Sequence, residues 1–276
     1  MSVDHYENFP VASVLCPPAL RPAITAIYHF ARTADDIADE GLASTEARLA
    51  DLADYRRDLM LVATGQPSSA RWARVFTPLA AQIARHRLPV PLLADLLDAF
   101  AQDTRNPLYP DRAALLDYCR RSADPIGRLL LHLYGIADAQ ALRRSDAICS
   151  ALQLINFWQD LSVDSPRGRH YVPEADRTQH RVTLSDLATR RDSPAARALV
   201  RELCGWAHGL MLEGAPLVHQ VPGRAGWELR LVVQGGLRIL EKIAAMDHAT
   251  LLRRPTVGAA DAPLLLWRAL AMRAAR

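Results

Sequence analysis

The chain has 276 residues, of which 50% are hydrophobic, and its formal net charge is +3. This length and apolar content are enough for one sizeable core, and so small a charge excess gives no electrostatic footprint for nucleic acid. No window comes near the roughly eighteen apolar residues of a membrane span, and residues 1–10 lack the basic and apolar regions of a signal peptide. The four cysteines show no CxxC spacing, so we expect a cytoplasmic protein with reduced thiols.

The composition favours an all-α fold, because helix formers dominate and alternating β-branched runs are scarce. Thr45 is the expected N-cap of the second helix, and Thr183 with Asp186 forms a capping box. In chain order, the expected helices cover about 21–40, 45–63, 69–86, 91–102, 112–134, 138–163, a short segment from 183, 194–213, 225–246 and 263–275. No repeat or composition break marks a linker, so we predict one helical domain over residues 1–276.

The helix expected over 112–134 contains Pro125. A proline at this place removes an i→i−4 hydrogen bond and bends or breaks the helix. One interpretation is a plain bend, in which Asp124 caps the segment that restarts. The other is a functional kink that exposes the Asp124 carboxylate to an apolar cavity, where it could hold a water molecule and accept its proton as a catalytic base.

An acidic line follows the first apolar stripe. Between residues 24 and 31 apolar side chains recur at helical spacing, and Asp35 and Asp39 continue the same stripe. Two aspartates at this spacing often form a solvated face, at a cost of a few tenths of a kcal/mol. Here they lie on the side expected to face the core, where uncompensated carboxylates would cost several kcal/mol. They therefore require cations.

A second line repeats this pattern. Steps of four from residue 148 pass through apolar positions to Asn156, Asp160 and Asp164. If the two lines face each other across a cavity, they supply a cage of hard oxygen ligands. Such a cage suits Mg²⁺ rather than zinc.

Cationic and apolar groups around these lines suggest the ligand. Arg32 lies one turn before Asp35, and Arg169 and Tyr171 follow Asp164 in a polar loop. Guanidinium groups match phosphate oxygens in bidentate geometry, and the surrounding helices are apolar. We expect a diphosphate on a long apolar chain, whose carbon–oxygen bond is ionised with the help of metal and arginines.

The same residues carry a resemblance to the squalene/phytoene synthase family, and within it to the bacterial hydroxysqualene synthases of hopanoid biosynthesis. The most specific segments are residues 5–11, 31–40, 118–134 and 152–171. The resemblance implies an all-α isoprenoid synthase fold with a central cavity between two aspartate-rich helices, and it implies Mg²⁺ as cofactor.

The resemblance also assigns roles residue by residue. It implies five metal-binding positions, which are Asp35, Asp39, Asn156, Asp160 and Asp164. The four aspartates among them are also expected to be catalytic. Its diphosphate-contacting positions are His5, Asn8, Arg32, Arg169 and Tyr171.

Two positions depart from the family pattern. Arg121 stands where squalene and dehydrosqualene synthases carry a tyrosine linked to the first condensation, and we expect it to contact substrate. Gln159 stands where other members often carry arginine. These departures agree with the subgroup that converts presqualene diphosphate and water to hydroxysqualene and diphosphate.

Two other functions remain open. The first is head-to-head condensation of prenyl diphosphates to presqualene diphosphate, squalene or a phytoene-like product, and the second is a non-catalytic helical binding protein. The apolar substrate further suggests a transient contact with the membrane surface and contacts with other enzymes of isoprenoid synthesis, although no dedicated anchor helix is evident in the sequence.

Overall fold

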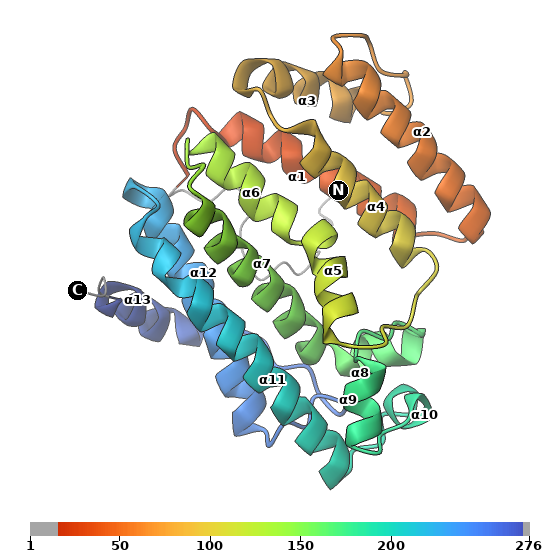
Figure 1. The fold of residues 1–276 in the computed structure, drawn as a ribbon, viewed down its shortest axis with the longest axis vertical. Coiled ribbons are helices and arrows are strands. Elements are labelled where there is room, and N and C mark those ends of the chain that lie inside the picture. The colour runs from red at the N-terminus through yellow and green to blue at the C-terminus, as the bar shows by residue number, and fades with distance from the viewer. Residues whose placement is uncertain (1–15, 273–276) are drawn as a thin grey trace.

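A computed structural model describes residues 16–272, and it contains helices and no strand in that range (Figure 1). The helices are α1 (Arg21–Asp39), α2 (Thr45–Ala63), α3 (Ala73–His86), α4 (Val90–Asp103), α5 (Arg112–Ser122), α6 (Asp124–Leu133), α7 (Ala139–Gln159), α8 (Leu161–Asp164), η1 (Ser165–Arg167), α9 (Glu174–Gln179), α10 (Leu184–Ala188), α11 (Pro194–Gly214), η2 (Ala215–His219), α12 (Gly223–Ala245), η3 (Ala259–Asp261) and α13 (Ala262–Ala271). The all-α prediction is confirmed.

Side-chain capping sets the start of several helices. The Ser44 side chain accepts a hydrogen bond from the Ala47 amide at 3.2 Å, so the N-cap of α2 is Ser44 and the prediction of Thr45 was wrong by one residue. The predicted capping box at Thr183 and Asp186 is confirmed. α3 begins at residue 73 rather than 69, because the buried carboxylate of Asp58 accepts hydrogen bonds from both the amide and the hydroxyl of Ser69 and holds that segment as a loop.

Two predicted long helices are interrupted. The helix expected over 112–134 divides at Ala123 into α5 and α6, as the proline two residues later requires. The helix expected over 138–163 ends at Gln159, and α8 continues after Asp160. The Asp160 amide still donates to the Asn156 carbonyl at 2.9 Å, and the Asp164 amide donates to the Asp160 carbonyl at 2.9 Å. The second acidic line is therefore kinked at Asp160 without being lost.

The helices form two packed groups. α1 packs against α2, α3 and α4, whereas α7 is central to the other group and packs against α5, α6, α11 and α12. Leu129 of α6 belongs to the core of the first group and Leu131 to the core of the second, so α6 joins them. Figure 1 shows α1 with α2, α3 and α4 in the upper part of the view and α7 among the helices below. None of the described helices is long and apolar enough to cross a membrane.

Candidate functional site

An apolar cavity of about 520 Å³ lies between α1, α6, α7 and α12. Its wall along α1 includes, in chain order, Ile24, Ile27, Tyr28, Ala31, Arg32 and Asp35. The apolar stripe predicted from helical spacing therefore faces this cavity. Asp35, the first residue of the acidic line that continues this stripe, lies at the carboxyl-terminal end of the α1 wall, and Arg32 lies beside Asp35.

A second apolar cavity, of about 570 Å³, lies between α7, α12 and α13. Ile126, Cys149 and Leu152 line both cavities, so the two spaces adjoin across α6 and α7. Together they could hold an apolar ligand with two long arms.

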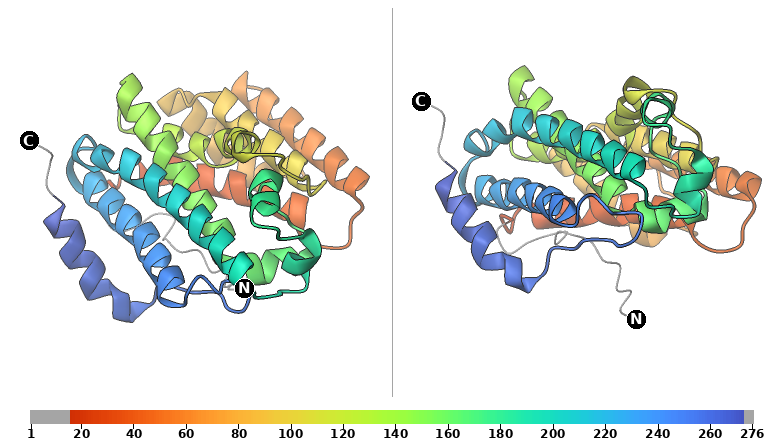
Figure 2. Two further views of the ribbon diagram at one scale, coloured as in Figure 1. Left: turned by 60° about the horizontal axis from the view of Figure 1, so that its bottom comes forward. Right: turned by 90° about the horizontal axis from the view of Figure 1, so that it is seen from below.

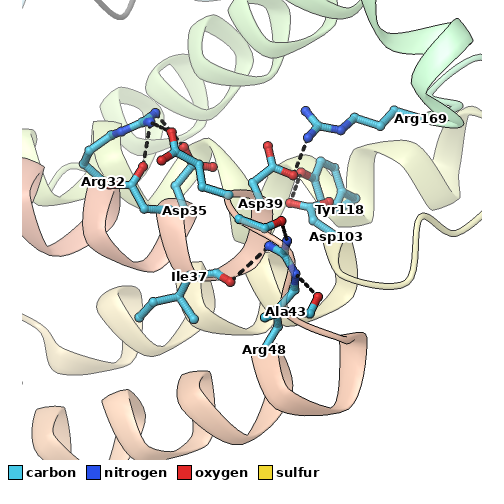
Figure 3. Close-up of polar contacts among 12 residues, drawn as sticks. Arg32, Asp35, Ile37, Asp39, Ala43, Arg48, Asp103, Tyr118 and Arg169 are labelled. Atoms are coloured by element: carbon cyan, nitrogen blue, oxygen red, sulfur yellow. Dashed lines mark hydrogen bonds and ion pairs between the residues drawn. The ribbon is translucent and has the colours of Figure 1, made fainter. Parts of the chain in front are cut away.

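The carboxylates at the end of α1 are paired with arginines (Figure 3). The Arg32 guanidinium contacts Asp35 at 2.8 Å and Asp36 at 2.6 Å. Asp39 forms an ion pair with Arg169, which comes from the loop after η1. The segment that follows the second acidic line thus binds the first line directly, although the two are far apart in sequence.

The second acidic line lies close enough to the first for their charges to interact. The pKa of Asp164 is raised to about 6, mainly by burial and also by the negative charges of Asp160 and Asp39, while Arg169 opposes the rise. Asp160 forms an ion pair with Arg254, and burial raises its pKa despite that guanidinium. The two acidic lines therefore lie close together, but they do not line one cavity: Asp35 lines the first cavity, Asn156 lines the second, and the other three residues line neither.

Asp103, at the end of α4, is an additional carboxylate of this site. Burial raises its pKa to about 7, with a hydrogen bond from Tyr118 opposing the rise and the charges of Asp39 and Asp35 adding to it. The Tyr118 hydroxyl donates to the Asp103 carboxylate at 2.8 Å. Burial also raises the pKa of Asp35 to about 6, with Arg32 opposing and Asp39 adding to the rise.

This donor set fits a hard divalent cation in chemical type. The site gathers carboxylate oxygens, several of them with pKa values raised mainly by burial, and Mg²⁺ prefers oxygen ligands of this kind. In residues 16–272, however, no three histidine, cysteine or acidic side chains converge into a metal cluster. The predicted cage of oxygens is therefore not preassembled, because arginines hold several of its carboxylates.

The loop after η1 is packed through the ring of Tyr171. The Tyr171 ring stacks on Phe157 with centroids 3.7 Å apart and an interplanar angle of 6°. Tyr109 also stacks on Tyr171, and Tyr118 lies against it at 6.1 Å. Such aromatic pairs stabilise the loop beyond simple area burial. They hold it beside the acidic groups.

Other predicted residues lie elsewhere. Asn156 lines the second cavity and not the first. Arg121 donates to Gln102 at 2.8 Å and to Asp117 at 3.1 Å, and it lines neither cavity. His5 and Asn8 lie outside the described residues.

Asp124 does not occupy either of its predicted settings. It makes no capping hydrogen bond to α6, and it lines neither cavity. Its buried carboxylate instead accepts a hydrogen bond from the Ser150 hydroxyl of α7 at 2.9 Å. Burial raises its pKa to about 7, with the Ser150 bond opposing the rise. The break at Ala123 turns this side chain towards α7 and away from the cavities, so the idea of a water held there by Asp124 needs correction.

Sequence reasoning missed Asp103 and Arg254. Neither belongs to a periodic line, and each reaches the site through contacts between distant segments. The nearest signal for Arg254 was Gln159, whose buried amide donates to the Pro255 carbonyl at 2.7 Å and holds the neighbouring residue against Asp160.

Comparison with known proteins agrees with this geometry. A sequence model of the squalene/phytoene synthase family matches residues 3–261. A hydroxysqualene synthase from Rhodopseudomonas palustris is 31% identical over 243 residues, which are 87% of this chain and 80% of the relative. A hydroxysqualene synthase from Zymomonas mobilis is 41% identical over 184 residues, which are 66% of this chain and 59% of that relative.

A solved structure shows the same architecture. The squalene synthase from Alicyclobacillus acidocaldarius has a TM-score of 0.81 and 37% identity, and the match covers 88% of this chain and 90% of that one. The chain therefore belongs to the squalene/phytoene synthase family and has its all-α isoprenoid synthase fold.

Proposed function

We propose that this prenyl-diphosphate-processing protein is a hydroxysqualene synthase, which converts presqualene diphosphate and water to hydroxysqualene and diphosphate. The observation that carries the proposal is the meeting of two acidic lines and their arginines beside two adjoining apolar cavities. The names of the two hydroxysqualene synthases that resemble the chain support this choice of reaction.

In this proposal the arginines bind the departing diphosphate. Arg32 and Arg169 lie beside the first acidic line and Arg254 beside the second. Guanidinium groups are suited to this role because they stay charged and match phosphate oxygens. Their charge would stabilise the diphosphate as its carbon–oxygen bond breaks.

The carboxylates would hold the cofactor. Asp35 and Asp39 from one line and Asp160 and Asp164 from the other would bind Mg²⁺, with Asp103 adding negative charge nearby. Bound there, Mg²⁺ would neutralise charge on the leaving diphosphate.

The apolar walls serve the carbon skeleton. The cavities are lined mainly by aliphatic side chains from α6, α7 and α12, so they would exclude bulk water while the cation rearranges. Capture by one admitted water, with transfer of its proton to the departed diphosphate, would then give an alcohol. The packed ring of Tyr171 lies beside the polar end, where it would shield this step.

The alternative within the family is head-to-head condensation of two farnesyl diphosphates. One observation favours it: the solved relative of 37% identity is described as a squalene synthase. Two cavities would also accept two separate prenyl chains.

Product analysis separates the two reactions. The protein is incubated with Mg²⁺ and either presqualene diphosphate or farnesyl diphosphate alone, and the organic products are identified by mass spectrometry. Hydroxysqualene from presqualene diphosphate, with no coupled product from farnesyl diphosphate, is expected. Formation of presqualene diphosphate or squalene from farnesyl diphosphate would establish the alternative instead.

A further inference from the structure

The helix α13 turns an apolar face to solvent. Its exposed side chains include Pro263, Leu266, Trp267, Leu270 and Ala271, which follow the i, i+3, i+4, i+7, i+8 spacing of one helical face. Leu266 is 54% exposed, and Trp267 and Leu270 are each 66% exposed. No charged residue of α13 is exposed. A contiguous apolar patch of this kind marks a site of interaction.

Polar contacts on the inner side hold α13 in place. Arg268 contacts Glu241 of α12 at 2.5 Å. Just before α13, Asp261 contacts Arg238 at 2.8 Å and Lys242 at 2.5 Å. Figure 2 shows α13 at the edge of the molecule beside α12. The outer apolar face is therefore a fixed feature of a well-anchored helix.

The same helix forms a wall of the second cavity. Leu265 and Leu266 line that cavity, and Leu266 is also half exposed on the outer surface. An apolar surface thus runs from the outside of α13 to the space that, on the proposed function, holds an arm of the substrate.

The size and chemistry of the face argue against a second copy as its occupant. A ten-residue helix is only about 15 Å long, and a stable interface buries roughly 800 Å² on each partner. Apart from the indole N–H of Trp267, the exposed side chains of the face offer no charge or hydrogen-bonding group to orient a protein partner. A lipid surface needs neither, because apolar side chains and tryptophan enter the headgroup and acyl boundary without specific contacts.

We propose that α13 docks on a lipid bilayer through Leu266, Trp267 and Leu270, and that this places the second cavity at the membrane surface. The choice of lipid ligand rests in part on the proposed function, because that function gives the cavity a water-insoluble substrate and product. The docking surface is defined by the exposed stripe itself.

The test is flotation of the full chain with neutral phosphatidylcholine vesicles, which removes attraction between the net positive chain and anionic lipid. The double variant Trp267→Ser/Leu270→Ser should bind these vesicles at least about tenfold more weakly than the wild type, since each change removes a large apolar side chain from the contact. The matched control is Leu212→Ser, which removes a leucine that is 51% exposed on α11. It should bind as the wild type does.

Equal binding by the double variant, or no binding by the wild type, would overturn the proposal. So would a dimer of the wild type in light scattering that the double variant converts to monomer, because a second copy would then cover the face. Turnover of presqualene diphosphate in detergent separates this proposal from the proposed function. The double variant should retain that turnover, whereas a wild type inactive in detergent would refute the proposed reaction and leave the vesicle result standing.

Discussion

The substitution Asp124→Asn tests whether this buried carboxylate serves structure or chemistry. The pKa of Asp124 is raised from its ordinary 3.8 to about 7, mainly by burial. A tenfold change in proton affinity corresponds to about 1.4 kcal/mol. The ionised side chain should therefore destabilise the native state by about 4 kcal/mol at most. Asparagine keeps an oxygen that can accept the Ser150 hydrogen bond, but its amide N–H₂ group must also be buried, which offsets part of the gain. We therefore expect the free energy of unfolding to rise by about 1–3 kcal/mol at about pH 8.

The gain should depend on pH in a defined direction. Below about pH 4 the carboxyl group is protonated in both the folded and the unfolded chain, so its charge costs nothing. As the pH rises from about 4 to about 7, the unfolded chain ionises first and the native state loses stability relative to it. The advantage of Asp124→Asn should thus be largest above about pH 7 and less than half as large at about pH 5.

Urea denaturation at both pH values measures this difference. The matched control is Asp51→Asn, because a hydrogen bond from Arg71 lowers the pKa of Asp51, and this variant should gain nothing at high pH. The product of the Asp124→Asn enzyme should be unchanged. No gain in stability at about pH 8 would contradict the raised pKa of Asp124. Diversion to proton-loss hydrocarbons would show that Asp124 acts in the reaction and would restore it as a water-holding base.

Four further substitutions test the site and its scaffold. Asp35→Asn and Asp160→Asn should each lose most turnover in a steady-state assay while circular dichroism shows an intact fold, and full activity in either would refute its assignment. Arg169→Gln should weaken binding of inorganic diphosphate in calorimetry by about tenfold or more, given that charge-assisted hydrogen bonds contribute about 1.5–3 kcal/mol; unchanged affinity would remove this residue from the site. Gly214→Ala should destabilise the protein by about 1–3 kcal/mol in urea denaturation, because a new Cβ would lie 2.6 Å from the Arg144 carbonyl oxygen, and wild-type stability would contradict that close helix contact.

Local periodicity accounts for what the sequence could predict. The stripe that ends in Asp35 and the line through Asp160 both follow from residues three or four apart, and such neighbours share a helix face in any packing. The capping box at Thr183 and Asp186 likewise placed the start of α10. Because an acidic line on a core-facing stripe requires compensation, the meeting of the two lines could also be anticipated.

Contacts between distant segments account for the parts of the site that could not be predicted from the sequence. Asp103 and Arg254 join the site only because α4 and the loop after α12 pack beside it, and no spacing rule reports that. The stacking of Tyr171 on Phe157 is likewise tertiary. The helix expected over 263–275 is confirmed as α13, but periodicity alone does not tell which of its apolar side chains face inward.

The central claim is that water ends the reaction of presqualene diphosphate in this site. The most direct measurement is incubation with presqualene diphosphate and Mg²⁺ in water labelled with heavy oxygen, with and without NADPH, followed by mass spectrometry of the product. The account predicts hydroxysqualene that carries the label under both conditions. Squalene that forms only when NADPH is present would contradict it.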